Sequence, residues 1–291
     1  MWKCPACQRE LTLVNESSRS VWQCSEGHHY DVAKEGYVNL LLANQKHSKD
    51  PGDNKIMINA RRQFLEAGYY QPLAVNLAHL MERYMPELVA QHRQVHLFDA
   101  GCGEGYYLEQ IRQYLQNETG LSVSATGCDI AKNAVQKAAK KYTENHFSVA
   151  STYHLPLLSQ SQDVVFQIFA PGDAAEIRRV LKQHGIWLWV NAGPRHLQEL
   201  KALIYQTPEL HTLPQQTMLG FEPLYQQTLS FEFTLTTDQA RERLLAMTPF
   251  YWAASQQLDK VRENLHNVTA EFYIQVMRNS ESIDQQCQQQ Q

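Results

Sequence analysis

The amino-acid sequence predicts an α/β protein in which a mostly parallel sheet follows a small metal-binding ribbon. Apolar strand patterns alternate with helix patterns from residue 95 to residue 205, which is typical of a parallel sheet covered on both faces. Two close pairs of metal-ligating residues lie within the first 28 positions, before this alternation begins. The 291 residues, 43% of them hydrophobic, suffice for one large domain with an appendage or for two modest domains.

The charge distribution excludes a uniformly basic protein, because the formal net charge is −4. Residues 1–62 carry 9 Lys and Arg against 7 Asp and Glu, whereas the remainder carries 17 against 23. The N-terminal part is therefore the side expected to face phosphates. No long apolar run and no signal-peptide pattern are present, which predicts a cytoplasmic protein with no membrane partner. Six cysteines in that compartment favour metal ligands or ordinary thiols over disulfides.

The first ligand pair is Cys4 and Cys7, and the second is Cys24 and His28. Two pairs on tight turns are what a tetrahedral zinc site requires, so we expect one structural zinc ion held by these four side chains. His29 is an alternative fourth ligand, and a chance cluster of free thiols is the competing interpretation. Residues 11–13 and 20–22 are expected to form two short strands between the pairs.

We expect four segments: a zinc ribbon at 1–36, linking helices at 37–94, a main domain at 95–278 and a disordered tail at 279–291. The linking helices are expected at 56–67, ended by Gly68, and at 73–84, opened by Pro72. They can cover one end of the sheet. The candidates for contact with phosphates are Lys46, Lys49, Lys55, Arg61 and Arg62. A solvated basic face is the alternative, and Arg62 could instead bond within the protein.

The chain is organised around Asp99-x-Gly101-x-Gly103-x-Gly105, which joins an apolar strand at 95–98 to a helix beginning at 106. Glycines allow a tight turn and close approach of the backbone to a ligand. The dinucleotide fingerprint spaces its glycines differently, as G-x-G-x-x-G. A carboxylate two residues before the first glycine would repel a pyrophosphate and suits a cationic or hydroxyl-bearing ligand. The alternative is a tight turn with no ligand.

Further strands are expected at 121–130, 146–150, 163–169 and 185–190, with helices at 131–142 and 174–182 between them. Asp129 lies at the end of the second strand, where such folds bind ribose hydroxyls. Two late strands, at 228–236 and 268–277, flank a helix at 238–247 and bring the expected total to seven strands.

The glycine-rich stretch resembles motif I of the class I S-adenosylmethionine (SAM) methyltransferases, whose cofactor carries an amino group, a sulfonium and no phosphate. This resemblance assigns Asp129 to the SAM ribose. In that fold the acceptor lies against the loop after the fourth strand, here Phe169–Gly172. Methylation of exocyclic amines typically uses an Asn/Asp-Pro-Pro-aromatic loop there, and methylation of pyrimidine carbon needs a thiol that this region lacks. The expected reaction is therefore direct in-line transfer of the methyl group to an oxygen or a ring nitrogen.

A more specific resemblance covers about residues 1–278. The motifs are Cys4-x-x-Cys7, Cys24-x-x-x-His28, Lys34-Glu35-Gly36-Tyr37-Val38-Asn39-Leu40, Asp50-Pro51-Gly52-Asp53, Ala60-Arg61-Arg62-x-Phe64-Leu65, Tyr70-Gln71-Pro72-Leu73, the glycine-rich stretch, Gly193-Pro194-Arg195-His196 and Met247-Thr248-Pro249-Phe250. Together they resemble the 23S rRNA (guanine-N1)-methyltransferases of the RlmA type.

The resemblance implies a Rossmann-like SAM domain that methylates N1 of one guanine in a hairpin of domain II of 23S rRNA, of the guanine(745)-N(1) type. It also implies a zinc ribbon that helps recognise RNA, and a homodimer. Carried over by motif, the SAM contacts would be Tyr70, Gly103, Glu104, Asp129 and His196, and Asp99, Gly101 and Gly105 of the glycine-rich stretch complete the eight expected cofactor residues. Tyr70 and His196 could instead be packed residues.

Two other functions remain open. The chain could be a methyltransferase for a small molecule, with a ribbon that is only structural. It could also be a non-catalytic RNA-binding module with a degenerate pocket, which the intact glycine motif opposes. No general base for guanine N1 is apparent in the sequence.

Overall fold

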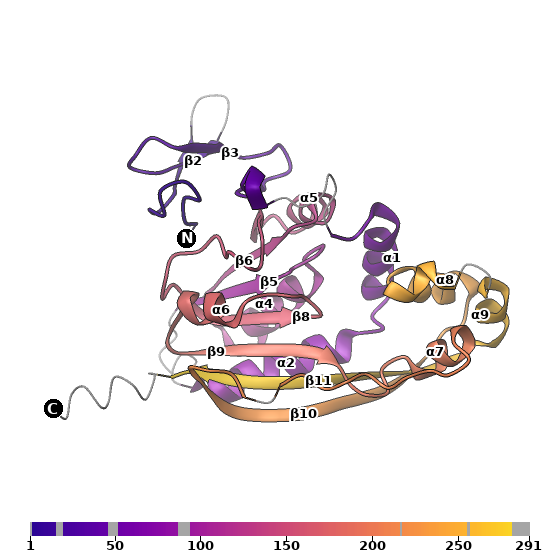
Figure 1. Cartoon of the computed structure of the whole chain (residues 1–291). Helices are drawn as coiled ribbons and strands as arrows, with labels where there is room; N and C mark the ends of the chain where they lie inside the picture. Colours follow the sequence, from indigo (N-terminus) through magenta and orange to yellow (C-terminus); the bar gives the residue numbers. More distant parts are fainter. Residues whose placement is uncertain are drawn as a thin grey trace.

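The computed structural model describes residues 2–15, 20–45, 52–86, 94–215, 217–254 and 257–280. It contains a three-stranded ribbon and an eight-stranded sheet (Figure 1). The ribbon is antiparallel and consists of β1 (Thr12–Asn15), β2 (Ser20–Gln23) and β3 (His29–Asp31). In the parts of the chain that the structure describes, no helix is long and apolar enough to cross a bilayer.

The large sheet has the strand order β10-β11-β9-β8-β5-β6-β7-β4. All neighbours from β4 to β9 pair in parallel, whereas β11 pairs antiparallel with both β9 and β10. The mostly parallel sheet predicted from the alternating pattern is therefore confirmed. Its strands are β4 (Val38–Asn39), β5 (Val95–Ala100), β6 (Val123–Asp129), β7 (His146–Val149), β8 (Gln162–Ile168), β9 (Leu181–Ala192), β10 (Phe221–Thr234) and β11 (Asn267–Asn279).

Helices connect and cover these strands. They are α1 (Lys55–Glu66), α2 (Gln71–Tyr84), α4 (Tyr106–Thr119), α5 (Lys132–Lys141), α6 (Ala174–Val180), α7 (Gln198–Ile204), α8 (Asp238–Ala246) and α9 (Leu258–Asn264), with short 3-10 turns η1 (Ala43–Gln45) and η2 (Pro249–Trp252). Asn54 caps α1, since its side-chain oxygen accepts hydrogen bonds from the backbone N–H groups of Ile56 and Met57.

Successive side chains of the central strand enter two different cores, because strand side chains alternate between faces. Leu97 packs in the core that contains Leu77 of α2 and Ile111 of α4. Phe98 packs in the opposite core with Ile177 of α6 and with apolar side chains of the ribbon, including Trp2. The ribbon therefore shares this core and lies at the β7–β4 edge of the sheet, where the ring of Trp22 meets that of His146 at the start of β7 (Figure 1).

The structure differs from the sequence-based expectation at the sheet edges. Val38–Asn39, which we expected within a linking segment, is an eighth strand paired with β7. Two residues are too short to show a strand period, so the pattern did not reveal it. β10 begins at Phe221 instead of 228, and a register shift at Pro223 accommodates the proline in this edge strand. α6 ends at Val180, and β9 begins immediately after it at Leu181.

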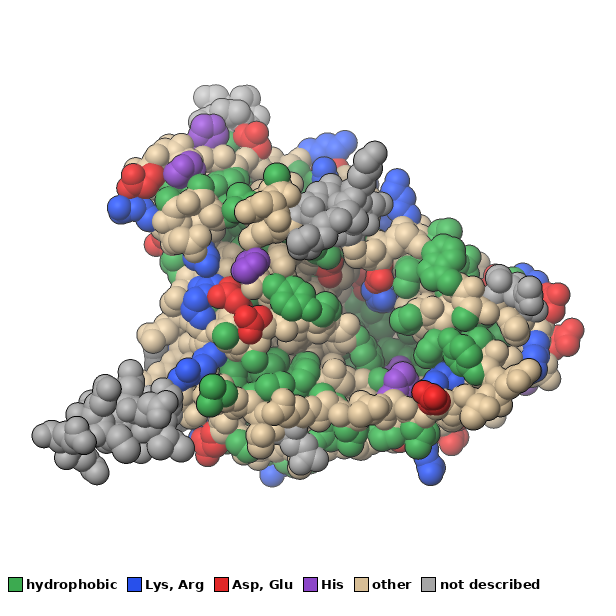
Figure 2. Space-filling model, viewed as in Figure 1, with side chains coloured by type: hydrophobic (Ala, Val, Ile, Leu, Met, Phe, Trp, Pro, Cys, Tyr) green, Lys and Arg blue, Asp and Glu red, His purple; other side chains and the backbone are tan. Residues whose placement is uncertain are grey.

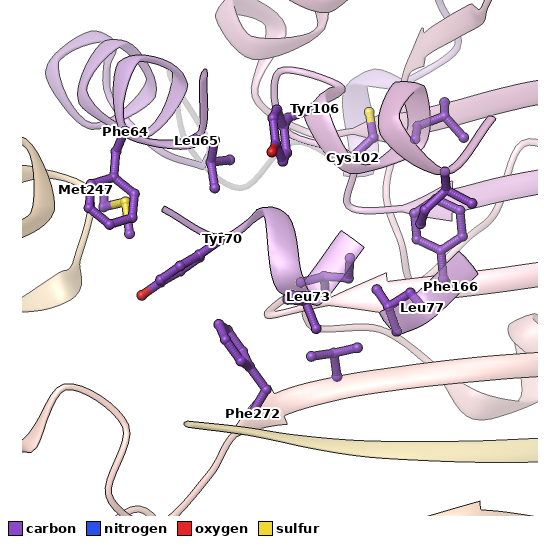
Figure 3. Packing of buried hydrophobic residues seen from close by; sticks show 14 of the residues in the cluster. Phe64, Leu65, Tyr70, Leu73, Leu77, Cys102, Tyr106, Phe166, Met247 and Phe272 are labelled. Atoms are coloured by element: carbon purple, nitrogen blue, oxygen red, sulfur yellow. The ribbon is translucent and has the colours of Figure 1, made fainter. Parts of the chain in front are cut away.

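Aromatic packing fixes α1 and α2 against the late strands, beside the ends of the central strands (Figure 3). Tyr70 lies between α1 and β11. Its ring meets the ring of Phe64 edge-on at 5.1 Å and that of Phe272 at 5.0 Å. Such edge-to-face contacts are favoured by the aromatic quadrupole. The segment before the first central strand is thereby held over the carboxyl ends of the sheet.

Candidate functional site

The ribbon brings four metal-ligating side chains together. The ligand atoms of Cys4, Cys7, Cys24 and His28 all lie within 4.8 Å of one another. Cys7 Sγ is 3.6 Å from Cys24 Sγ, and Cys24 Sγ is 3.4 Å from His28 Nδ1. A tetrahedral zinc ion with Zn–S bonds of about 2.3 Å separates its sulfur ligands by about 3.8 Å. Three thiols and one imidazole at this spacing fit a structural zinc ion.

His28, and not its neighbour His29, belongs to this cluster. His29 lies in β3, exposed, with Nδ1 3.2 Å from the carbonyl oxygen of Gly27. The preference for His28 in the predicted ligand set therefore agrees with the geometry of the ribbon.

A cavity of about 850 Å³ opens where β5, β6, β8 and β9 end. Figure 2 shows a hollow with many apolar side chains on this face, between the body of the sheet and the α1–α8 side. Parallel α/β sheets bind ligands at this edge. Seven of the eight predicted cofactor residues line it: Tyr70, Asp99, Gly101, Gly103, Glu104, Asp129 and His196.

The three glycines of the turn do different things. All have positive φ values, of 93° at Gly101, 53° at Gly103 and 83° at Gly105. A Cβ on Gly101 would lie 2.3 Å from Cβ of Ala170, so only glycine permits this close approach of two loops. A Cβ on Gly103 would meet no atom within 4 Å, so this backbone faces open space. Gly105 lies outside the cavity lining, and its Cβ would meet the ring of Phe147 at 3.0 Å.

Asp129 holds the glycine turn and lines the cavity. Its Oδ2 accepts a hydrogen bond of 2.9 Å from the backbone N–H of Gly103, and its Oδ1 accepts one of 2.7 Å from Ala131. Each carboxylate oxygen has a second lone pair. Asp129 can therefore accept further hydrogen bonds from two ligand hydroxyls while it fixes the turn.

The cavity concentrates acidic groups. Burial raises the pKa of Asp99 well above its usual range, and the charges of Asp129 and Glu104 add to that effect. Burial also raises the pKa of Glu104 to about 7, although the guanidinium of Arg62 opposes the shift. Glu104 is 4% exposed, and its Oε2 has no partner among the described residues. A cationic ligand would stabilise the ionised carboxylates and so lower the pKa values that burial raises.

Tyr70 and His196 meet on the opposite wall. The Tyr70 hydroxyl is 3.5 Å from Nε2 of His196, and Nδ1 of His196 is 2.8 Å from the carbonyl oxygen of Glu271. The backbone N–H of Glu271 also lies 3.2 Å from Nδ1, but the shorter contact places a proton on Nδ1. Burial lowers the pKa of His196 to about 3, so the imidazole is neutral at physiological pH.

Of the five predicted RNA-contacting residues, the structure describes three, and two of these three form hydrogen bonds within the protein. Lys46 and Lys49 lie outside the described residues, and Lys55 begins α1 on the exposed surface. Arg61 lines the cavity, forms an ion pair with Asp53 and donates to the carbonyl oxygen of Met247 at 3.2 Å. The Nε of Arg62 donates to Glu66 at 2.7 Å. These bonds favour the alternative, in-protein role for Arg62 and give Arg61 a similar one.

The sequence placed the acceptor against the loop that begins at Phe169, but it indicated no role for other residues in the second half of the cavity, among them Asn191 and His211. Phe169 and Asn191 follow β8 and end β9, so strand-end position was an available signal. His211 lies in a long connection without periodic pattern, and no local signal marks it. The cavity thus has a cofactor half at β5 and β6 and a second half at β8 and β9.

The sheet order, the glycine-rich turn after β5 and the acid that ends β6 define a class I SAM-dependent methyltransferase joined to a zinc ribbon. A family profile described as RlmA, N-terminal, matches residues 2–49, and a methyltransferase-domain profile matches residues 98–189. The chain is 32% identical over 259 residues to the 23S rRNA (guanine(748)-N(1))-methyltransferase of Streptomyces fradiae, covering 86% of this chain and 85% of that protein.

It is 31% identical over 263 residues to a Micromonospora griseorubida protein named "Putative 23S rRNA (guanine-N(1)-)-methyltransferase", with 86% of each chain covered. A Bacillus subtilis (strain 168) protein with the same designation is 28% identical over 87% of this chain and 88% of its own length. The chain therefore belongs to the 23S rRNA (guanine-N1)-methyltransferases of the RlmA type. The resemblance inferred from the motifs is confirmed.

The residues at the cavity fit the SAM cofactor of this family. Gly103 offers an open backbone cradle, Asp129 retains free acceptor positions, and the unpartnered oxygen of Glu104 lies at the buried end. The acidic surroundings suit a ligand that carries an ammonium and a sulfonium. When bound, SAM supplies a methyl group activated by its positively charged sulfur. The protein's own task is then to orient the acceptor in line with that methyl group and to exclude water.

Proposed function

We propose that this protein methylates N1 of one guanine in 23S rRNA, in a hairpin of domain II and at the position denoted guanine 745. The support for the substrate is the match to rRNA methyltransferases over 86% of the chain, together with the separate matches of the RlmA N-terminal profile to the ribbon and of the methyltransferase profile to the SAM domain. A ribbon that was incidental to an unrelated small-molecule enzyme would not be expected to match the N-terminal profile of an rRNA methyltransferase family.

The chemistry is an in-line displacement at the methyl carbon. The N1–H bond of guanine breaks and its proton passes to water. The electron pair left on N1 forms the new N–C bond, while the old C–S bond breaks and its pair stays on sulfur. No covalent enzyme intermediate is needed, so this chemistry requires no nucleophilic thiol beside the acceptor.

The remaining features of the proposal concern RNA binding. We assign Lys46, Lys49 and Lys55 to phosphate contacts, with the zinc ribbon as part of the RNA-facing surface, and we expect a homodimer acting in the cytoplasm. Arg61 and Arg62 are assigned to holding α1 over the cavity, with any phosphate contact secondary. An overall acidic protein must concentrate basic side chains in this way to bind a polyanion.

The decisive experiment uses 23S rRNA from a strain that lacks the protein. Methylation at N1 blocks Watson–Crick pairing, so incubation with protein and SAM should create one new stop in primer extension and 1-methylguanosine in the nucleoside digest. Transfer of tritium from SAM to small molecules, with none to 23S rRNA, would refute the rRNA assignment. A stop at another guanine would refute only the position.

A further inference from the structure

Phe169 occupies a strained position at the second half of the cavity. Its φ of +52° lies in the left-handed region, which is unfavourable for a bulky side chain. The hydrogen bond from its backbone N–H to the carbonyl oxygen of Val190, 3.0 Å, holds this conformation. Phe169 is 47% exposed, so burial within the protein offsets little of this backbone strain. A strained, half-exposed aromatic ring at a cavity mouth indicates contact with a ligand.

The surroundings of Phe169 suit a flat aromatic ligand. Its ring centroid lies 5.4 Å from that of His196 and 5.7 Å from that of Phe272, so one side is supported by other rings. The next residue, Ala170, packs against Gly101 of the glycine turn. The open part of the ring is therefore next to the cofactor half of the cavity, where an acceptor base must lie to meet the methyl group.

Asn191 presents an unused donor at the same place. It follows Val190, the residue that holds Phe169, and it lines the same cavity. Its Nδ2 is buried and has no hydrogen-bond partner in the part of the chain that the structure describes. A buried donor without a partner is unfavourable, so this amide calls for a hydrogen-bond acceptor on a ligand.

We propose that Phe169 and Asn191 form the guanine-binding subsite: the base stacks on Phe169, and Nδ2 of Asn191 donates a hydrogen bond to guanine O6. The proposal rests on the proposed function, since it names how that substrate is held. When N1 gives its proton to water, negative charge spreads onto O6. A preorganised donor at O6 stabilises this charge, as donors do at other developing oxyanions. Asn191 thus selects guanine over adenine, whose 6-amino group is a donor.

The test replaces the donor by an acceptor of the same shape, in the full-length protein. Asn191→Asp and the control Asn264→Asp, an exposed site on α9 that does not line the cavity, carry the same charge change. Each is assayed on 23S rRNA fragments with guanine or 2,6-diaminopurine at the target position. Diaminopurine has a 6-amino donor and an N1 lone pair without a proton. SAM binding by calorimetry reports whether each variant is folded.

We expect Asn191→Asp to lower kcat/KM on guanine RNA about 100-fold. Its preference for guanine over diaminopurine should fall or reverse, because the carboxylate accepts from the 6-amino group. SAM affinity and the Asn264→Asp control should match the wild type within about 2-fold. An unchanged guanine-to-diaminopurine ratio in a variant that binds SAM would overturn the Asn191 assignment, whether or not overall activity had fallen.

Stacking is tested separately. Phe169→Leu keeps an apolar side chain but loses the ring, and Phe169→Tyr keeps the ring. Stacking on an aromatic side chain contributes about 1–3 kcal/mol per base, so Phe169→Leu should raise KM for RNA about 10-fold or more and Phe169→Tyr should restore it. Equal KM values for all three proteins would overturn the stacking role. Absence of guanine methylation by the wild type would instead refute the proposed function.

Discussion

The hydroxyl of Tyr70 lies 3.5 Å from Nε2 of His196, although 126 positions separate the two residues in the chain. Since Nδ1 of His196 carries the ring proton, Nε2 can only accept, and the tyrosine hydroxyl donates. The contact joins the start of α2 to the loop after β9. It therefore ties the segment preceding the first central strand to the second half of the cavity.

Tyr70→Phe should destabilise the fold by about 1 kcal/mol, because it leaves a buried imidazole nitrogen without its donor. Urea unfolding at pH 7 measures the change. Tyr69→Phe is the matched control: Tyr69 stacks on Phe64 at 4.6 Å, and that ring contact survives loss of the hydroxyl. Equal stabilities of the two variants would show that the Tyr70–His196 contact contributes nothing.

Cys7→Ser should abolish zinc binding, because it removes one of four ligands from the cluster. Elemental analysis of protein purified without chelator should give one zinc per wild-type chain and much less in the variant. Hydrogen exchange should rise in the ribbon, and most of the sheet should stay protected. Zinc-free wild-type protein would contradict the assignment.

Asp129→Ala should lower SAM affinity by about one to two decades, through loss of charge-assisted hydrogen bonds worth about 1.5–3 kcal/mol. Calorimetry measures the dissociation constant. Asp129→Asn retains one acceptor oxygen and should lose less. Since Asp129 also holds the Gly103 N–H, both variants need an unfolding measurement to separate a loosened turn from a lost ligand contact.

Glu104→Gln should remove a pH dependence of stability. Burial raises the pKa of Glu104 to about 7 in the folded protein, above the unfolded value of about 4.5, so this group destabilises the fold as pH rises through that interval. Relative to wild type, the Gln variant should therefore gain about 3 kcal/mol between pH 4.5 and pH 8 without SAM. Glu118→Gln, exposed on α4, should parallel the wild type. Parallel curves for Glu104→Gln would refute the shift.

Alanine at Lys46, Lys49 or Lys55 should weaken RNA binding and reduce the slope of log affinity against log salt by about one unit each. Arg62→Ala should leave that slope nearly unchanged and loosen α1 instead, because Arg62 bonds Glu66. SAM affinity should not respond to the lysine changes. If no lysine variant alters the slope, the RNA-facing surface lies elsewhere.

The features predicted correctly from the sequence are those that depend on residues close together in the chain. The strand–turn–helix around Gly101 and the acid at the end of β6 are local patterns, and the structure places both at the cavity. The eighth strand was not predicted, because Val38–Asn39 is too short to show a strand pattern and forms a strand only through its pairing with β7. The start of β10 was predicted too late in the chain, because a proline such as Pro223 is unfavourable within a strand.

The residues at the β8 and β9 ends of the cavity meet through convergence in space, which sequence patterns do not encode. Phe169, Asn191 and His211 come from three separate segments, and their meeting follows from strand order. The positive φ of Phe169 also has no signal in its residue type. The ribbon ligands were predictable for the opposite reason, since each pair is closed by one short turn.

The pairing of β4 with β7 has a consequence for how this protein avoids edge-to-edge strand pairing with other chains. Val38 and Asn39 cover part of an edge strand, and the backbone N–H of Leu40 donates to the carbonyl oxygen of Val149 at 3.0 Å. An uncovered edge is a template for pairing with other chains. A chain that lost its first forty residues would lose this protection along with the apolar contacts that the ribbon makes at the same edge. The N-terminal module would therefore be needed to prevent aggregation, independently of any part it has in catalysis.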